Sequence, residues 1–316
     1  MAILKLKPAY KDYLWGGRRL IDEFGMNCDK KILAEAWVLS CHPDGESIIV
    51  NGNFAGKTIA EYIKMNGAKI LGTNCRDFSD FPILIKLIDA KENLSVQVHP
   101  TDDYALIHEG QLGKSEMWYV LDAEKNSRLY YGFKKKIPRN EFAARIKDNS
   151  IVEVLNAVPA KKGEVLFIPA GTIHAVGKGV LLAEIQQNSN ISYRICDYDR
   201  GRPLHIAQAL DVTNLNPPDE RGKSYPHLAA CDYFVVDKIN LDGKIFSQIS
   251  GTIDDKTFLS VLILGGEGKI FCGDEEIFYR KGDSFFMTAG AGAWKICGTC
   301  DALLTTVPEK SYAKNF

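Results

Sequence analysis

Side chains that can bind a metal ion lie in three separate segments of this 316-residue chain. The first segment, NLSVQVHPTDDY (residues 93–104), alternates apolar and polar residues, so that Gln97 and His99 project from the same face of a strand. The apolar Val96 and Val98 project from the other face. A buried amide or imidazole without a partner costs about 1–3 kcal/mol. We therefore expect Gln97 and His99 to share a partner, and a metal ion would serve both.

The other two segments add a carboxylate and a second imidazole. Glu116 lies in GKSEMWYV, and His174 follows a Pro-Ala-Gly turn in GEVLFIPAGTIHAV. The spacing G-x5-PAG-x2-H, which ends at His174, matches the second motif of the cupins, a superfamily of double-sheet jelly rolls. The first cupin motif, HxH followed by Glu, is present in altered form as Gln97-x-His99 and Glu116.

The sequence therefore predicts a metal site made by His99, Glu116 and His174, with Gln97 nearby. Two His and one carboxylate leave coordination positions open, as a catalytic metal site requires. The same set is the facial triad of non-haem iron oxygenases, so spacing alone leaves iron open. A fourth ligand from Gln97 would fill a position that oxygen chemistry needs, which favours zinc. The remaining histidines are expected to be surface or structural residues: His42, His108, His205 and His227.

Short strands must position these side chains. Runs rich in β-branched and aromatic residues, bounded by Gly, Pro, Asn and Asp, are typical of a β-sandwich or barrel. Such runs predict strands at 47–50, 83–90, 117–123, 128–133, 164–170, 180–187, 258–266, 269–273 and 283–289. Helices are predicted over 57–67, 138–150 and 204–214. Thr58 and Asn140 are the expected N-caps of the first two helices, and Gly67 is the expected stop of the first.

Composition narrows the class of protein. With 46% apolar and 25% charged residues and a net charge of −1, the chain resembles a soluble globular protein without a nucleic-acid-binding surface. A membrane span needs about 18 consecutive apolar residues, and the sequence has no such run. The first residues contain Lys and Pro where a signal peptide needs an apolar stretch, so a cytoplasmic protein is expected. The eight cysteines, including the CGTC stretch, are expected to be reduced structural thiols.

A repeat indicates two domains of one kind. The copies are KKGEVLFIPAGTIHAV (161–176) with MWYVL (117–121), and RKGDSFFMTAGAGAWK (280–295) with LSVLI (259–263). In the second copy Ala293 replaces His174, and Phe258 falls opposite Glu116. Only the first copy should therefore bind metal.

The stretch TNLNPPDERGKSYPH (213–227) has the composition of a connector. The fold class that follows is mainly β, with two cupin-type jelly-roll β-sandwich domains and a few short helices. Residues 1–225 are expected to form the catalytic, metal-binding cupin domain with helical decoration. Residues 226–316 are expected to form a smaller cupin-like domain that lacks metal ligands.

Five motifs resemble those of the type I mannose-6-phosphate isomerases in their short bacterial form: YLWGG (13–17), QVHP (97–100), GKSEMWYVL (113–121), IPAGTIHAV (168–176) and AEIQQNSNISYRICDYDR (183–200). The resemblance implies one zinc ion per chain, with the ligands His99, Glu116, His174 and, as in some members, Gln97. It also implies an active-site arginine at Arg194, a catalytic or substrate-binding lysine at Lys114 and an active-site carboxylate at Glu184. The longer eukaryotic members carry a large helical domain where residues 133–160 here hold one short helix.

The reaction that the resemblance implies is the interconversion of D-mannose 6-phosphate and D-fructose 6-phosphate through an enediol. Glu184, Lys114 or a metal-bound water could shuttle the proton, and Arg194 could bind an oxyanion or phosphate. A local ion pair of Arg194 with Asp197 or Asp199 is the alternative for that residue. Two other functions stay open: an iron-dependent dioxygenase and a non-catalytic sugar-phosphate-binding cupin. The expected partner is a small sugar phosphate, and the chain should act as a monomer or homodimer.

Overall fold

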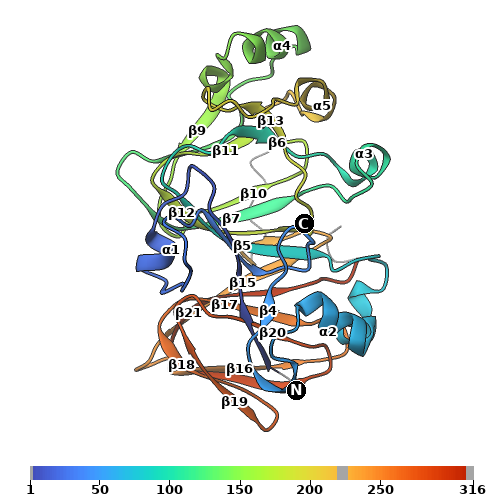
Figure 1. Ribbon diagram of the computed structural model, residues 1–316, viewed down its shortest axis with the longest axis vertical. Coiled ribbons are helices and arrows are strands. Elements are labelled where there is room, and N and C mark those ends of the chain that lie inside the picture. The colour runs from blue at the N-terminus through green and yellow to red at the C-terminus, as the bar shows by residue number, and fades with distance from the viewer. Residues whose placement is uncertain (1–2, 219–226, 311–316) are drawn as a thin grey trace.

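The computed structural model describes residues 3–218 and 227–310, which form a mainly β protein with a few short helices (Figure 1). This confirms the mainly β class that the sequence predicts. The strands of the described residues form three sheets, of ten, six and five strands. In Figure 1 the ten-stranded sheet lies at the bottom, the six-stranded sheet in the middle and the five-stranded sheet above it.

The six-stranded sheet is the middle layer. Its strand order is β10 (Val165–Ile168), β7 (Glu116–Ala123), β12 (Val180–Gln187), β5 (Ile83–Ala90), β3 (Glu35–Leu39) and β2 (Ala9–Lys11). All its neighbouring strands run antiparallel. Every residue of β5 and β12 is buried, so these two strands have no solvent-facing side.

The other two sheets cover the two faces of the middle layer. The five-stranded sheet has the order β13 (Tyr193–Cys196), β6 (Val96–Val98), β11 (His174–Val176), β8 (Arg128–Phe133) and β9 (Leu155–Pro159). The main path of the ten-stranded sheet is β14 (Ala229–Ala230), β15 (Val235–Asp242), β21 (Gly292–Thr306), β17 (Leu259–Gly265), β20 (Ser284–Met287), β1 (Ile3–Lys7) and β4 (Ile48–Ile49). Three further strands complete this sheet: β16 (Gln248–Ile253) and β18 (Glu267–Cys272) pair with β21, and β19 (Glu275–Arg280) pairs with β18.

Strand β7 shows why the middle layer is apolar on both faces. Met117 packs in one core with Phe286 of the ten-stranded sheet. Its neighbour Trp118 points the other way and packs with Val176 of the five-stranded sheet. Because side chains alternate along a strand, β5, β7 and β12 each contribute side chains to both of these cores. Burial on both faces produces continuous apolar runs, which made β5, β7 and β12 visible in the sequence.

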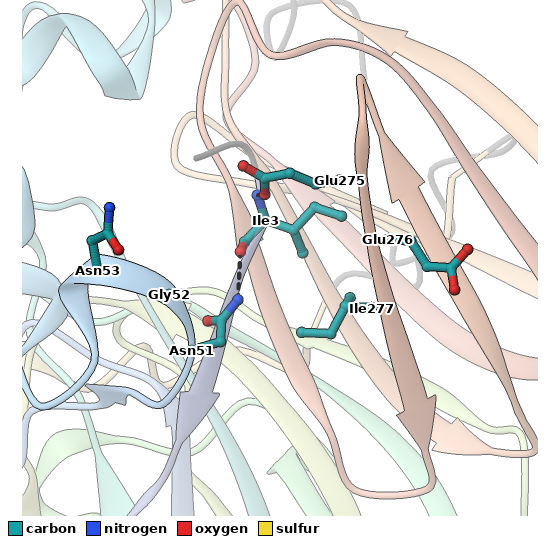
Figure 2. A pocket seen from close by; sticks show the side chains of 7 residues that line it. All are labelled: Ile3, Asn51, Gly52, Asn53, Glu275, Glu276 and Ile277. Atoms are coloured by element: carbon teal, nitrogen blue, oxygen red, sulfur yellow. Dashed lines mark hydrogen bonds between the residues drawn. The ribbon is translucent and has the colours of Figure 1, made fainter.

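The first strand, β1, belongs to the sheet that is otherwise built mostly from C-terminal strands. It pairs with β20, and Leu4 lies opposite Phe286. Figure 2 shows the edge of this arrangement, where the side-chain amide of Asn51 donates a 2.9 Å hydrogen bond to the carbonyl of Ile3. The other end of the same side chain accepts from the amide of Lys5 at 2.8 Å. Residues from the start of the chain are therefore part of the C-terminal sheet.

The connector predicted at 213–227 lies mostly in residues 219–226, outside the described residues. The predicted boundary between residues 225 and 226 lies there as well. The division into 1–225 and 226–316 stays a prediction. Two strands from its first part, β1 and β4, belong to the ten-stranded sheet, which is otherwise built from residues of the second part.

The strand pairing reproduces the repeat. The order β10-β7-β12-β5 in the middle sheet matches β20-β17-β21-β15 in the ten-stranded sheet. Ile168 lies opposite Glu116, whereas its counterpart Met287 lies opposite Leu259. The residue in the position of Glu116 is therefore Leu259, and the assignment of Phe258 is wrong by one residue. An apolar residue stands at the ligand position in either case.

The described helices are short: α1 (Arg19–Asp22), α2 (Ile59–Asn66), α3 (Asp102–His108), α4 (Arg139–Lys147) and α5 (Ile206–Val212), with 3-10 turns at Gly52–Phe54, Ala68–Leu71, Thr73–Cys75 and Ile151–Val154. The predicted cap of α2 is confirmed, since Thr58 and Glu61 form a reciprocal capping box and the helix ends at Gly67. The predicted cap of α4 is wrong, because the helix begins after Pro138, whose fixed φ sets its entry, and Asn140 lies inside the first turn. No helix among the described residues is long and apolar enough to cross a membrane.

Candidate active site

Three buried side chains from different strands converge between the middle and five-stranded sheets. His99 follows β6, Glu116 begins β7 and His174 begins β11. Nε2 of His99 lies 3.5 Å from one carboxylate oxygen of Glu116, and Nε2 of His174 lies 3.4 Å from the other. All three side chains are almost fully buried. The structure thus brings together the two His and one carboxylate that the sequence predicts as metal ligands.

The imidazoles are oriented so that their Nε2 lone pairs face Glu116. Nδ1 of His99 lies 2.9 Å from the carbonyl of Ile191, and Nδ1 of His174 lies 2.8 Å from the carbonyl of Thr172. A carbonyl only accepts, so each Nδ1 carries the proton and each Nε2 is a free acceptor. This arrangement is typical of metal-binding histidines, whose other nitrogen donates to a carbonyl or carboxylate.

Two buried acceptors in the triad have no hydrogen-bond donor. They are Nε2 of His174 and Oε1 of Glu116, which face each other. Leaving buried acceptors unsatisfied costs about 1–3 kcal/mol each, so a native structure rarely does so without a reason. A divalent cation would satisfy both atoms, and the ligand atoms of the triad all lie within 4.8 Å of one another. The residues present therefore fit a metal ion.

Electrostatics keep the triad in the protonation state that binds metal. Burial, with a further effect of the Lys114 ammonium, lowers the pKa of His99 to about 3. Burial also lowers the pKa of His174. For Glu116, burial alone would raise the pKa, but Lys114 and the two imidazoles outweigh it and hold the pKa well below its usual range. The set consists of two neutral imidazoles and one carboxylate, which are the forms that bind Zn²⁺ or another divalent ion.

Lys114 and Glu184 adjoin the triad, as predicted. Nζ of Lys114 lies 3.2 Å from Nε2 of His99, contacts the Glu116 carboxylate and lies 3.7 Å from Glu184. Glu184 is held in place from both neighbouring strands, since it pairs in register with Trp118 of β7 and Lys86 of β5. Its carboxylate accepts from Trp118 Nε1 at 3.0 Å and lies 3.1 Å from Lys86 Nζ.

Lys86 is a buried site residue that the sequence reasoning missed. Its ammonium lies between Glu184 at 3.1 Å and Glu35 at 3.8 Å. Burial would lower its pKa, but the two carboxylates outweigh burial and raise the pKa above its ordinary value. The signal was a single Lys within the apolar run ILIKLIDA (83–90), which requires a buried partner.

The remaining predicted residues, Gln97 and Arg194, lie on adjacent strands in one row with His174. Gln97 pairs in register with His174 on one side and with Arg194 on the other. Gln97 and Arg194 both line a pocket of about 230 Å³ that Lys114 and Glu184 also line. The further lining residues include Tyr13, Trp15, Glu35, Lys86, Ser192 and Arg202. The position of Gln97 beside His174 supports Gln97 as a metal ligand. That role stays a prediction.

Arg194 is not used in a local ion pair with Asp197. It donates to the carbonyl of Pro203 at 2.9 Å, while its buried Nε has no partner in the structure. Asp197 instead binds Arg200 and Arg202. Burial and the nearby Arg202 lower the pKa of Arg194. A positive, partly unsatisfied guanidinium at the pocket is suited to an anionic ligand.

The fold and the site together define a class: a two-sandwich cupin with a buried His-Glu-His set and a lysine beside it. The type I catalytic-domain model of the phosphomannose isomerases matches residues 3–130, and the cupin-domain model of the mannose-6-phosphate isomerases matches residues 224–307. The chain is 34% identical to mannose-6-phosphate isomerase ManA of Bacillus subtilis, over 96% of this chain and 98% of that protein. The chain therefore belongs to the type I mannose-6-phosphate isomerase family of enzymes.

Further relatives agree. Mannose-6-phosphate isomerase of Streptococcus mutans is 34% identical over 92% of this chain and 93% of its own length. The crystal structure of mannose 6-phosphate isomerase from Bacillus subtilis superposes with a TM-score of 0.86 at 32% identity, covering 96% of this chain and 99% of that one. Phosphomannose isomerase from Salmonella typhimurium, at 18% identity and a TM-score of 0.80, shares the fold. The predicted pair of cupin-type domains and the predicted family are confirmed.

Proposed function

We propose that this enzyme interconverts D-mannose 6-phosphate and D-fructose 6-phosphate, with one Zn²⁺ per chain held by His99, Glu116, His174 and Gln97. The observation that carries the proposal is the buried contact of Lys114 with Glu116 and Glu184 at the end of a pocket that Arg194 lines. Such a site combines a metal set, an acid, a base and an anion-binding group. The names of the relatives that are similar over nearly the whole chain supply the substrate class.

Zn²⁺, when bound, would polarise the substrate carbonyl and stabilise negative charge on its oxygen. The carboxylate of Glu184 removes the C2 proton from the open-chain aldehyde, and the ammonium of Lys114 gives a proton to O1, which leaves a 1,2-enediol. Lys114 then takes the proton from the O2 hydroxyl, and Glu184 returns its proton to C1. The product is the 2-ketose, and both side chains regain their starting states.

The two charged elements of the pocket have separate tasks in this proposal. Lys86 and the Trp118 indole hold the carboxylate of Glu184 at 3.1 and 3.0 Å, so the base is oriented before substrate arrives. Arg194 binds the phosphate, with Arg202 adding positive charge at the same pocket. The base and the anion-binding group are therefore separate residues of the same pocket.

The test is formation of fructose 6-phosphate from mannose 6-phosphate by the purified chain, before and after treatment with a chelator and again after zinc is restored. Loss of turnover with the chelator and recovery with zinc would support the substrate and the metal together. Absence of turnover in zinc-loaded protein would reject the proposed reaction. Oxygen consumption with iron, or saturable sugar-phosphate binding without turnover, would then favour the two alternative functions.

We also propose that the enzyme works in the cytoplasm, as a monomer or homodimer. All eight cysteines are free thiols, including Cys297 and Cys300 of the CGTC stretch. Free thiols in this number suit a reducing compartment. The substrate is a small sugar phosphate, and no nucleic acid or membrane partner is required.

A further inference from the structure

The backbone on both sides of Lys114 is held by one carboxylate outside the catalytic set. The amide of Gly113 donates to Oδ1 of Asp102 at 2.8 Å. The amide of Ser115 donates to Oε1 of Gln187 at 2.7 Å, and Nε2 of Gln187 in turn donates to the same Oδ1 of Asp102 at 2.9 Å. Asp102 thus fixes the residue before Lys114 directly and the residue after it through one buried amide.

This segment lies directly against the chain around Asp102. The amide of Lys114 donates to the carbonyl of Pro100 at 3.0 Å. A Cβ placed on Gly113 would come within 2.5 Å of the Pro100 oxygen and within 2.6 Å of the Asp102 nitrogen, which no side chain tolerates. The backbone next to Lys114 therefore packs directly against residues 100–102, and the hydrogen bonds of Asp102 hold it there.

The second oxygen of Asp102 binds a residue from the other half of the molecule. The hydroxyl of Tyr233 donates to Oδ2 of Asp102. Tyr233 lies in the stretch that matches the cupin-domain model, whereas Asp102 lies in the stretch that matches the catalytic-domain model. The ring of Tyr233 packs at 5.9 Å from that of Phe78, which fixes the phenol from its other side. The C-terminal half thus contacts the residue that orients the lysine segment.

We infer that Asp102 and Tyr233 are positioning residues for the isomerisation, and that through them the C-terminal cupin, which lacks metal ligands, sets the place of Lys114. The inference rests on the proposed function. Asp102 accepts hydrogen bonds from three neutral donors. Asp102 and Tyr233 both line a pocket of about 580 Å³. Without the phenol hydroxyl, Oδ2 would lose its donor, and the carboxylate would be free to turn towards water in this pocket and away from Gly113.

The experiment compares two tyrosine variants of the zinc-loaded full chain. Tyr233→Phe removes the donor to Asp102 and leaves the ring in place. Tyr279→Phe is the matched control, because its hydroxyl also makes buried hydrogen bonds in the C-terminal half, to the carbonyls of Thr299 (2.9 Å) and Cys297 (3.2 Å). We expect kcat to fall roughly 10- to 100-fold in Tyr233→Phe, with KM and zinc content close to those of the unsubstituted protein. Tyr279→Phe should keep its kcat.

Hydrogen–deuterium exchange gives a second readout that does not depend on turnover. Amides in the peptide covering residues 109–117 should exchange faster in Tyr233→Phe than in the unsubstituted protein, and at the unsubstituted rate in Tyr279→Phe. An unchanged kcat or an unchanged exchange rate in Tyr233→Phe would overturn the inference. Equal losses of kcat in both variants would also overturn it, since stability would then explain the effect. If the unsubstituted protein has no isomerase activity, the proposed function fails, and unchanged exchange would still reject the link between Tyr233 and the lysine segment.

Discussion

The ammonium of Lys114 lies 3.2 Å from Nε2 of His99, although both side chains are buried. Since Nδ1 of His99 carries the proton, Nε2 presents its lone pair to that ammonium. The buried His-Glu-His set thus has a positively charged neighbour in Lys114. Lys114 also contacts the Glu116 carboxylate, which places a proton donor beside the metal site.

Replacement of His174 by Gln should abolish tight metal binding. We expect the affinity for Zn²⁺ to fall by more than the roughly 10- to 100-fold loss that follows removal of a residue supporting a ligand. Metal content after dialysis, measured by mass spectrometry, checks this. His108→Gln is the control, because His108 lies outside the site and stacks on Tyr104 at a centroid distance of 4.1 Å. Zinc retained at full occupancy in the His174 variant would exclude this residue as a ligand.

Replacement of Lys114 by Met should leave zinc bound and reduce turnover. Removal of a general acid typically costs roughly 10²- to 10⁴-fold in rate, and kcat should fall within that range. The control is Lys162→Met, at an exposed residue. A Lys114→Met enzyme with normal kcat would remove the lysine from the proton-transfer scheme.

Replacement of Glu184 by Gln keeps the shape and an acceptor for Trp118 but removes the base. Turnover should be lost together with exchange of the substrate's C2 proton with deuterated solvent. Lys86 would also lose its nearest carboxylate, and breaking a buried pair costs about 3–5 kcal/mol of unfolding free energy. The double variant Glu184→Gln/Lys86→Met should regain stability without regaining turnover. Continued C2 exchange in Glu184→Gln would assign the base to another group.

Metal-free protein should become less stable as the pH falls from 6.5. The pKa of His99 is about 3 in the folded chain and 6.5 as its ordinary value, so between these values the unfolded chain binds a proton that the folded chain does not. The contribution of His99 to the free energy of unfolding is therefore fully present above pH 6.5. It decreases as the pH falls towards 3, by at most about 1.4 kcal/mol per pH unit. Urea unfolding at pH 7, 6 and 5 in the presence of a chelator measures this change in the free energy of unfolding. In His99→Gln the free energy of unfolding should depend less on pH. Equal pH dependence in the variant and the unsubstituted protein would contradict the prediction.

Replacement of Phe286 by Ala should weaken the contact between the ten-stranded and middle sheets. The ring is fully buried and packs at 5.0 Å from that of Phe258 and 6.1 Å from that of Phe81. We expect a loss of about 3–5 kcal/mol of unfolding free energy, from denaturant titration. Phe278→Ala, at a ring that is 67% exposed, should change stability by less than about 0.5 kcal/mol. Similar losses in both variants would mean that this core does not hold the sheets together.

The strands whose bounds the sequence predicts best are long runs rich in apolar, β-branched and aromatic residues. The predicted bounds of β5, β8 and β12 coincide with the observed ones, and of these β5 and β12 are buried along their whole length. Strands β1 and β3 were missed, since pairing with residues far along the chain leaves little local signal. Helix α3 was missed as well, although Thr101 and two acidic residues in its first turn are an ordinary start signal.

The candidate site also contains residues that the sequence predicts and residues that it does not. His99, Glu116 and His174 are recognisable because a metal needs particular side chains at positions set by a turn and by strand ends. Lys86 is marked only as a single Lys in an apolar run, and its partners Glu35 and Glu184 are not recognisable because they lie on other strands. Register decides which residues face each other across strands, and a single sequence does not display register. The contact of Tyr233 with Asp102 is hidden because it joins a loop and a helix that are 131 positions apart in the chain.

The position of β1 in the ten-stranded sheet has a consequence for synthesis on the ribosome. Lys5 binds Asp283 at 2.7 Å, and the two residues are 278 positions apart. A chain made from its amino end can pair this first strand with β4 early, but the side of β1 that pairs with β20 stays unpaired until almost all of the protein has emerged. The His-Glu-His residues are translated long before that moment, so the metal set can assemble on a nascent chain whose sheet beneath is still incomplete. A pause in translation near residue 280 should leave a species that exposes the unpaired edges of β1 and β17, which makes it a target for chaperones.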